Sequence, residues 1–177
     1  MQGEHSYNKR LALVLDTSAL LAKYYRLLPR SVMDVYTTSL AVSEVRDLEN
    51  RQALLEAIDV GIINITDPEK RYINTILLEA KNTGSLSKLS TTDIHIAALA
   101  LMLRERYSNV IVITDDYELQ NLLLNIKISF KPLKTSGITC FIKYTVYCPI
   151  CYYTPSNPGE TTCPFCGAKL TRKRSRT

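Results

Sequence analysis

Two pairs of cysteines near the carboxyl end of the sequence have the spacing of a metal site. Eleven residues separate the pairs, and each pair is a Cys-x-x-Cys turn that can present two thiolates to one ion: Cys148, Cys151, Cys163 and Cys166. Gly167, directly after the second pair, suits the exit from such a turn because glycine tolerates a positive φ. Soft thiolates select zinc, with iron as a competitor, and four of them leave no position for water. The sequence therefore predicts one structural Zn²⁺ site without catalysis.

A role for these cysteines without metal fits the sequence less well. Two redox pairs or unligated thiols would leave the short C-terminal segment, which is poor in apolar residues, with nothing to hold its fold. With no export signal in the sequence, paired cysteines favour metal over disulfides. Cys140 has no partner in this scheme, and we expect it to be a small buried apolar residue.

Acids that follow predicted strands or open predicted helices form a second candidate group. Asp16 ends the first strand, Asp115 and Asp116 end the fourth, Glu44 lies in the helix after the second strand, and Asp93 opens a long helix. Ligands of open parallel sheets bind beyond the carboxyl ends of the strands, so these acids can meet in one crevice. Mg²⁺ and Mn²⁺ prefer oxygen ligands, and they activate water and neutralise the charge of a phosphate.

Each acid also has a purely structural interpretation. Asp93 can form a helix N-terminal box with Ser90, Asp116 can cap its helix, and Glu44 can be one more solvated acid. Asp16 is harder to assign to such a role, because it directly follows five apolar strand residues. The sequence has no Gly-rich phosphate loop and no Ser-His-Asp or Cys-His nucleophile pattern. Both interpretations of the acids stay open at this point.

Alternating strands and helices must position these side chains. The expected strands are 11–15, 35–38, 62–65, 110–113 and 126–130, and the expected helices are 18–28, 39–50, 51–60, 69–81, 91–107 and 116–124. The first and fourth strands are almost wholly apolar, as in strands buried on both faces. The pattern predicts an α/β fold, a parallel-sheet α/β/α sandwich, followed by a small C-terminal zinc ribbon.

The regular pattern ends near residue 130, where the charge also changes. Residues 1–130 have a net charge of −2 and residues 131–177 a net charge of +7, within a chain total of +5. The basic end indicates a polyanionic partner, although a solubilising tail accounts for a charge run equally well. We expect an α/β domain at 1–130, a linker or return strand at 131–145, a zinc ribbon at 146–170 and a basic tail at 171–177.

Length and composition exclude several classes of protein. The 177 residues, 46% of them hydrophobic, suffice for one domain with a small appendage and argue against wholesale disorder. No apolar run approaches the roughly 20 residues of a membrane span. The first ten residues have no apolar signal-peptide core. We therefore expect a cytoplasmic protein with no membrane partner.

The ordered set of acids resembles the PIN-domain nucleases. Over residues 11–130 the resemblance rests on Asp16-Thr-Ser, Glu44, Ser90-x-x-Asp93 and Thr114-Asp-Asp116. The four-cysteine ribbon and Thr-Asp-Asp-Tyr-x-Leu-Gln-Asn at 114–121 extend it to nearly the whole chain, which then resembles the archaeal Nob-type endonuclease family. The resemblance implies a PIN-like fold and endonucleolytic cleavage of single-stranded RNA.

The resemblance also implies roles for single residues and for partners. The Mg²⁺ or Mn²⁺ ligands would be Asp16, Glu44, Asp93 and Asp116. The family's Thr-x-Asp pattern favours Asp116 as the fourth acid, and the choice between it and Asp115 stays open. Thr17 and Thr114 would hydrogen-bond the ligands or a water. The substrate would be precursor small-subunit ribosomal RNA, cut at its 3′ end on the small ribosomal subunit, with assembly factors as further partners.

The expected chemistry is attack of an activated water on the scissile phosphate, leaving a 5′-phosphate and a 3′-hydroxyl. The RNA backbone is expected to contact Lys169, Arg172, Lys173, Arg174 and Arg176, with salt-sensitive affinity. Bases are expected to stack on Tyr144, Tyr147, Tyr152, Tyr153 and Phe165. For at least half of these aromatic residues, packing of the small ribbon core is the better interpretation.

Three other functions fit parts of the pattern. A PIN ribonuclease of a toxin system would use the same chemistry, but the ribbon argues against it. A non-catalytic adaptor that binds RNA or the ribosome would use the acids only as helix caps. A transcription-type zinc ribbon fused to an unrelated α/β domain would bind DNA or a polymerase instead.

Overall fold

A parallel sheet of five strands forms the centre of the computed structural model, which describes residues 11–29, 32–157 and 159–174. The strand order is β3-β2-β1-β4-β5, and every neighbouring pair is parallel. The strands are β1 (Leu11–Leu15), β2 (Met33–Thr37), β3 (Asn64–Ile65), β4 (Asn109–Ile113) and β5 (Ser129–Lys131). The central strands β1 and β4 are mostly buried, which accounts for their apolar sequences. The predicted α/β fold is confirmed.

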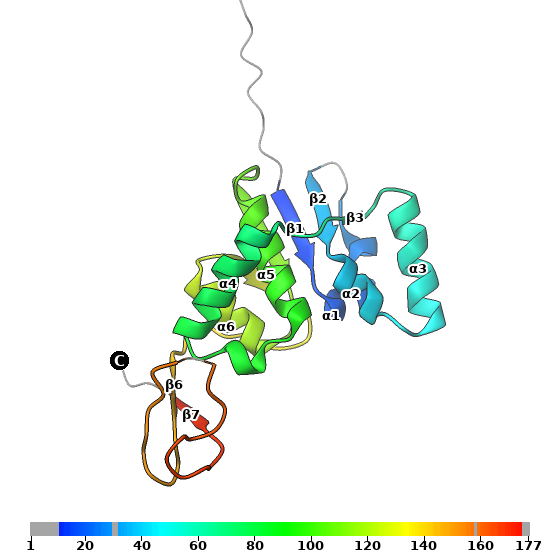
Figure 1. The fold of residues 1–177 in the computed structure, drawn as a ribbon. Coiled ribbons are helices and arrows are strands. Elements are labelled where there is room, and N and C mark those ends of the chain that lie inside the picture. Colours follow the sequence, from blue (N-terminus) through cyan, green and yellow to red (C-terminus); the bar gives the residue numbers. More distant parts are fainter. Residues whose placement is uncertain (1–10, 30–31, 158, 175–177) are drawn as a thin grey trace, which may run out of the picture.

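Six α-helices accompany the sheet (Figure 1). They are α1 (Thr17–Leu21), α2 (Ser39–Glu44), α3 (Leu48–Asp59), α4 (Lys70–Asn82), α5 (Thr91–Leu103) and α6 (Tyr117–Asn125). Two short 3₁₀ helices, η1 (Tyr24–Leu27) and η2 (Leu86–Lys88), lie between them. Helix α5 is buried almost all round, because it packs against α4 as well as against β1 and β4. Among the described helices, none is long and apolar enough to cross a membrane.

The prediction of one continuous helix over 39–50 is wrong, because two helices, α2 and α3, share this segment. Helix α2 ends at Glu44, where Val45 turns to an extended conformation with ψ 96°. Asp47 then caps a new helix by accepting a hydrogen bond from the Asn50 N–H at 2.9 Å. The N-cap of α2 is Thr38. Glu44 is therefore the last residue of a short helix.

The order of the strands reverses between β1 and β4. From β1 the chain adds β2 and β3 on one side, and it returns to add β4 and β5 on the other. Leu15 pairs with Ile113, and the Asp16 N–H then donates to the Ile113 carbonyl at 3.2 Å. The residues that leave the two strands lie side by side, at the place where open α/β sheets bind ligands.

A small antiparallel sheet forms the C-terminal module, defined here as residues 144–174. Strand β6 (Tyr144–Tyr147) pairs with β7 (Thr171–Arg174), and an isolated bridge joins Thr162 to Lys169. The expected division at 145/146 falls inside β6, and the one at 170/171 directly precedes β7. In Figure 1 the module lies beyond α4 and α6, past the end of the sheet toward which β1 points. Arg176 lies outside the described residues.

Candidate active site and metal centre

Asp16 lies at the junction of β1 and β4 and is 7% exposed. It is the N-cap of α1, and its Oδ1 accepts a hydrogen bond from the Thr17 N–H at 2.6 Å. Its Oδ2 accepts one from Thr114 Oγ1 at 2.8 Å. Burial, with smaller contributions from the charges of the nearby Asp93 and Asp116, raises the pKa of Asp16 to about 6 against these hydrogen bonds. A cation at this carboxylate would offset its burial.

Glu44 is held at both carboxylate oxygens by threonines. Thr17 Oγ1 donates to Oε2 at 2.6 Å, and Thr92 Oγ1 donates to Oε1 at 2.5 Å. Thr17 follows Asp16 and Thr92 precedes Asp93, so Glu44 lies between the elements that carry those two acids. The interpretation of Glu44 as a merely solvated acid is wrong, although its side chain is exposed.

Asp93 takes part in both of the arrangements that the sequence left open. Its Oδ2 accepts from the Ser90 N–H at 2.7 Å, and Ser90 Oγ accepts from the Asp93 N–H at 3.1 Å, which is a complete capping box. Burial raises the pKa of Asp93, and the charges of Asp116 and Glu44 add to the effect. Capping uses one carboxylate oxygen, and the side chain is near enough to Asp116 and Glu44 for their charges to raise its pKa.

Asp116 caps α6 and is exposed. Its Oδ1 accepts from the N–H groups of Glu118 and Leu119 at 2.7 and 2.9 Å. The Asp116 N–H donates to Thr114 Oγ1 at 3.1 Å, so one threonine hydroxyl contacts both Asp16 and Asp116. The cap predicted for Asp116 exists, and the same carboxylate raises the pKa of Asp16 and of Asp93.

Asp115 points elsewhere, into the segment after β5. Its Oδ1 accepts from the N–H groups of Leu133, Lys134 and Thr135 at 2.8, 2.9 and 3.2 Å. Burial alone would raise the pKa of Asp115, but these backbone donors outweigh it and hold the pKa below the usual value. The two adjacent acids therefore have different surroundings.

The acids are near enough to raise the pKa of Asp16 and of Asp93, but they do not close around a common point. Within the described part of the chain, only the four cysteines bring three or more ligand atoms within 4.8 Å of one another. A cation shared by the carboxylates would require their side chains to turn inward. The contact of Thr92 with Glu44 was not predicted from the sequence. The sequence does contain a pattern that indicates it: a threonine lies beside Asp16 and beside Asp93, and another lies two residues before Asp116.

The four cysteines converge as their spacing predicted. The Sγ atoms of Cys148 and Cys166 are 3.4 Å apart, those of Cys151 and Cys163 3.4 Å, and those of Cys151 and Cys166 3.7 Å. A tetrahedral zinc site with bonds near 2.3 Å has sulfur–sulfur edges of roughly 3.8 Å, so the cluster fits such an ion with small adjustments. The backbone N–H of Cys151 lowers the pKa of Cys148, whereas hydrogen bonds among the neighbouring thiols raise the pKa of Cys151 and of Cys166.

Two details of the cysteine region stand apart from the cluster. Gly167 has φ +71°, as its place after the second turn predicted. Cys140 is exposed and not buried, so that expectation is wrong. Its segment, between Gly137 and β6, has no regular structure that would pack it into a core. The group of four remains able to bind a metal without it.

Some basic and aromatic residues of the module contact other side chains, and several of them are also exposed to solvent. The Arg172 guanidinium pairs with Glu118 and lies 4.0 Å from the Tyr144 ring centroid. Lys173 Nζ lies 4.8 Å from the Tyr147 centroid. Tyr152 and Phe165 are each 76% exposed, although Phe165 also contacts Tyr153 edge to face at 5.0 Å. Lys169, Lys173 and Arg174 are exposed as well.

Comparisons with known proteins agree with this geometry. The family model described as "PIN domain of ribonuclease" matches residues 13–103. The chain is similar to Endoribonuclease Nob1 of Methanothermobacter thermautotrophicus, with 32% identity over 92% of this chain and 93% of the relative. It is also similar to Ribonuclease VapC3 of Aeropyrum pernix, with 34% identity over 72% of this chain and 90% of the relative.

A eukaryotic relative is much longer than this chain. The 20S-pre-rRNA D-site endonuclease NOB1 of Saccharomyces cerevisiae is 31% identical over 55% of this chain, which corresponds to 21% of the yeast protein. The similarity therefore concerns a part of that relative, whereas the archaeal Nob1 is matched over nearly its whole length.

Proposed function

The chain belongs to the Nob1 family of PIN-domain endoribonucleases, and from this premise we propose that it cuts precursor small-subunit rRNA at the 3′ end, using divalent cations held by four carboxylates. Its membership makes it an endoribonuclease with a role in rRNA processing. The observation that supports the site is the double hydrogen bond of Glu44 to Thr17 and Thr92. These bonds gather the elements that carry Asp16 and Asp93 at the reversal of strand order.

Mg²⁺ or Mn²⁺ fits the donor set proposed for the cleavage site. The donors are carboxylate oxygens, which hard cations prefer: Asp16, Glu44, Asp93 and Asp116. Asp16 is buried with a raised pKa, and its neighbours Asp93 and Asp116 are also acids, so a cation would relieve the repulsion among them. When bound, such an ion supplies an activated water and neutralises the charge on the phosphate. The threonines hold the carboxylates in place for it.

The fourth ligand in this proposal is Asp116. Thr114 contacts it and Asp16 with one hydroxyl group, and its charge acts on Asp16 and Asp93. Asp115 instead anchors the backbone of residues 133–135, so we propose a structural role for it.

We propose zinc as the ion of the cysteine cluster, and the module around it as the part that binds the RNA backbone. Four thiolates at tetrahedral spacing favour zinc. Lys169, Lys173 and Arg174 are exposed for phosphate contacts, and Tyr152 and Phe165 for stacking. The small ribosomal subunit would present the RNA, and the location would be cytoplasmic. The proposed division is an α/β nuclease domain up to β5, a linker, and the module at 144–174.

The toxin alternative has weaker support. VapC3 is matched over 128 residues and the archaeal Nob1 over 164, but a second relative, Ribonuclease VapC1 of Thermoplasma acidophilum, is matched over 161 residues at 30% identity, so match length alone does not separate the two functions. The adaptor alternative draws on the capping roles of Asp16, Asp93 and Asp116. Only a cleavage experiment can distinguish a non-catalytic adaptor from an endoribonuclease.

The test uses a small-subunit rRNA precursor fragment with a 3′ extension, incubated with the protein and Mn²⁺. Asparagine caps helices as well as aspartate does, so Asp116→Asn removes the charge and keeps the cap. Asp47→Asn, in the N-cap of α3, is the matched control outside the site. We expect cleavage at the 3′ end of the mature sequence by the wild type and by Asp47→Asn, and a loss of about 100-fold or more in Asp116→Asn. RNA binding without cleavage by the wild type would favour the adaptor.

A further inference from the structure

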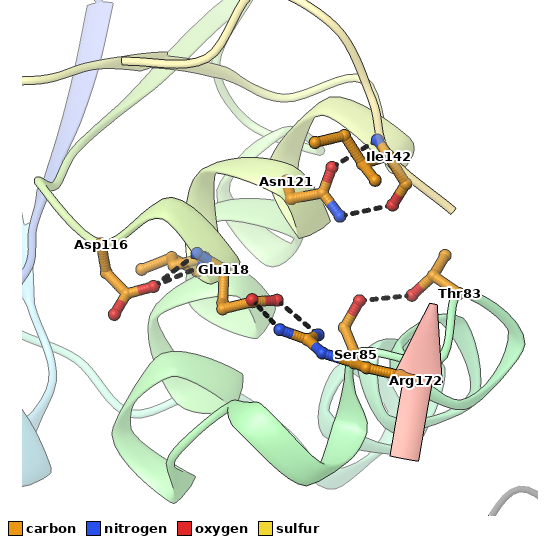
Figure 2. A network of polar contacts seen from close by, with 8 residues as sticks. Thr83, Ser85, Asp116, Glu118, Asn121, Ile142 and Arg172 are labelled. Atoms are coloured by element: carbon orange, nitrogen blue, oxygen red, sulfur yellow. Dashed lines mark hydrogen bonds and ion pairs between the residues drawn. The ribbon is translucent and has the colours of Figure 1, made fainter. Parts of the chain in front are cut away.

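Arg172 and Glu118 join the C-terminal module to the nuclease domain (Figure 2). Arg172 lies in β7 and Glu118 in the first turn of α6. Nη1 donates to Oε2 at 3.0 Å, and Nη2 donates to Oε1, so the pair is bidentate. The two side chains are 18% and 24% exposed, and the guanidinium also lies over the Tyr144 ring. A planar pair held in this way fixes orientation as well as distance.

Glu118 contacts Asp116 with its backbone. The Glu118 N–H donates to Asp116 Oδ1 at 2.7 Å, beside the Leu119 N–H at 2.9 Å. One residue therefore contacts the module through its side chain and a proposed cleavage-site carboxylate through its main chain, as Figure 2 shows. The module is held one helical turn from that carboxylate.

Two further contacts support the same placement. Asn121 donates to the Ile142 carbonyl at 2.8 Å and accepts from the Ile142 N–H at 2.7 Å, which imitates strand pairing just before β6. On the other side, the Tyr144 N–H donates to the Thr83 carbonyl at 3.1 Å. A Cβ on Gly84 would lie 2.6 Å from the Tyr144 carbonyl oxygen. The start of the module is held between α6 and the loop after α4.

Charge pairing at this junction changes the interpretation of Arg172. Its place in a basic run predicted contact with RNA, but its guanidinium is engaged by Glu118 and by Tyr144. The neighbouring Lys173 and Arg174 are exposed on the same strand. Adjacent residues of β7 therefore have different surroundings. Arg172 attaches the module to α6, whereas Lys173 and Arg174 remain exposed to a polyanion.

We propose that Glu118 and Arg172 are positioning residues that determine which phosphodiester bond is cut. The inference rests on the proposed function, in which the module binds the RNA. Cations held by the carboxylates would contact a phosphate but no particular base, so the choice of bond requires a second contact at a fixed distance. A module on a loose tether would raise only the local concentration of RNA. A module clamped to α6 presents the bound strand to the acids in one register.

The test reverses the charges singly and together, as Glu118→Arg, Arg172→Glu and the double swap. Cut positions are mapped at nucleotide resolution on the precursor fragment, and hydrogen–deuterium exchange is followed over residues 140–147. We expect each single variant to cut at several neighbouring bonds, to raise KM for the precursor by about tenfold, and to exchange faster over β6. The kcat on an RNA too short to reach the module is expected to stay within about threefold of wild type. The double swap is expected to restore the single cut position, the wild-type KM and the slow exchange over β6.

The control variant is Glu49→Arg, which reverses one charge of the ion pair between Lys23 and Glu49, away from the module. It is expected to leave the cut position and the exchange unchanged. Folded single variants that still cut at one bond, with unchanged exchange over β6, would overturn the positioning role alone. Absence of cleavage by the wild type would count against the proposed function and would remove this inference with it.

Discussion

The hydroxyl of Thr114 donates a hydrogen bond to Oδ2 of Asp16, with 2.8 Å between the two oxygens, at the buried junction of β1 and β4. Thr114 Oγ1 also accepts a hydrogen bond from the backbone N–H of Asp116 at 3.1 Å. Thr17 and Thr92 provide the corresponding contacts to Glu44. Threonine hydroxyls thus orient the acids that charge repulsion would drive apart in the absence of a cation.

Thr114→Val removes a donor that lowers the pKa of Asp16. Without it the pKa rises further, so more of the acid is protonated at a given pH. Hydrogen bonds to charged groups contribute about 1.5–3 kcal/mol, so the acid limb of the pH–rate profile should move up by about one to two pH units. Thr114→Ser keeps the hydroxyl and should keep the wild-type profile. An unchanged acid limb in the valine variant would show that the bond does not tune Asp16.

Asp16→Asn is expected to make the metal-free protein more stable while abolishing cleavage. The folded-state pKa of about 6 lies above the ordinary 3.8, so ionisation of Asp16 opposes folding. The penalty is absent below pH 4, grows between pH 4 and 6, and is full above 6, where it amounts to about 3 kcal/mol at most. Urea unfolding in a chelator should therefore show a gain of about 1–3 kcal/mol at pH 7 and none near pH 4.

Asp47→Asn is the control for that stability measurement. Hydrogen bonds from Asn50 lower the pKa of Asp47, so its ionisation favours folding and its replacement should give no gain at pH 7. Equal stability of the wild type and Asp16→Asn at pH 7 would contradict a strained carboxylate at position 16. A gain that persists at pH 4 would have to come from something other than charge.

The positions of the main acids could be predicted because strong local patterns define them. Five apolar residues end at Asp16, and a capping sequence opens the helix at Asp93. The cysteine cluster follows from spacing alone. The fold class follows from the alternation of strands and helices, since each pattern reports a local period.

The features that escaped prediction depend on contacts between distant segments. No proline or glycine marks the break after Glu44, where the Arg51 guanidinium donates to the Val45 carbonyl at 3.3 Å. Arg172 belongs to a basic run that resembles a solvated tail, and only the fold brings Glu118 opposite to it. Asp115 and Asp116 are indistinguishable by type, and their hydrogen-bond partners differ because residues 133–135 return to Asp115.

Asp115→Ala is expected to loosen the segment after β5 and to leave much of the cleavage intact. It removes the acceptor of three backbone N–H groups, which should cost about 1–3 kcal/mol of stability at pH 7. The lowered pKa of Asp115 means that this contribution fades as the pH falls through that pKa. Denaturant unfolding and Mn²⁺-dependent cleavage should be compared with those of Asp116→Asn. If Asp115→Ala lost cleavage as completely as Asp116→Asn, the assignment of the fourth ligand would be wrong.

Cys148→Ser is expected to unfold the C-terminal module while the α/β domain stays folded. The described residues of the module form two short strands, and a four-thiolate zinc site in a small peptide contributes about 10–16 kcal/mol of apparent binding free energy. Elemental analysis should find about one zinc per chain in the wild type and little in the variant. Cys140→Ser changes an exposed cysteine outside the cluster and should keep the zinc. Equal zinc content in the wild type and Cys148→Ser would refute the site.

Gly84→Ala and Gly61→Ala separate backbone strain from the docking of the module. Both glycines have a left-handed φ, +70° and +69°, so alanine should cost about 1 kcal/mol at either position. A Cβ at Gly61 meets nothing within 4 Å, whereas a Cβ at Gly84 would lie 2.6 Å from the Tyr144 carbonyl oxygen. Because backbone cannot yield as a side chain does, Gly84→Ala should push β6 away, speed hydrogen exchange over residues 142–147 and spread the cut positions. Gly61→Ala should show only the small loss of stability. Identical exchange over β6 in the two variants would mean that the close approach at Gly84 does not hold the module in place.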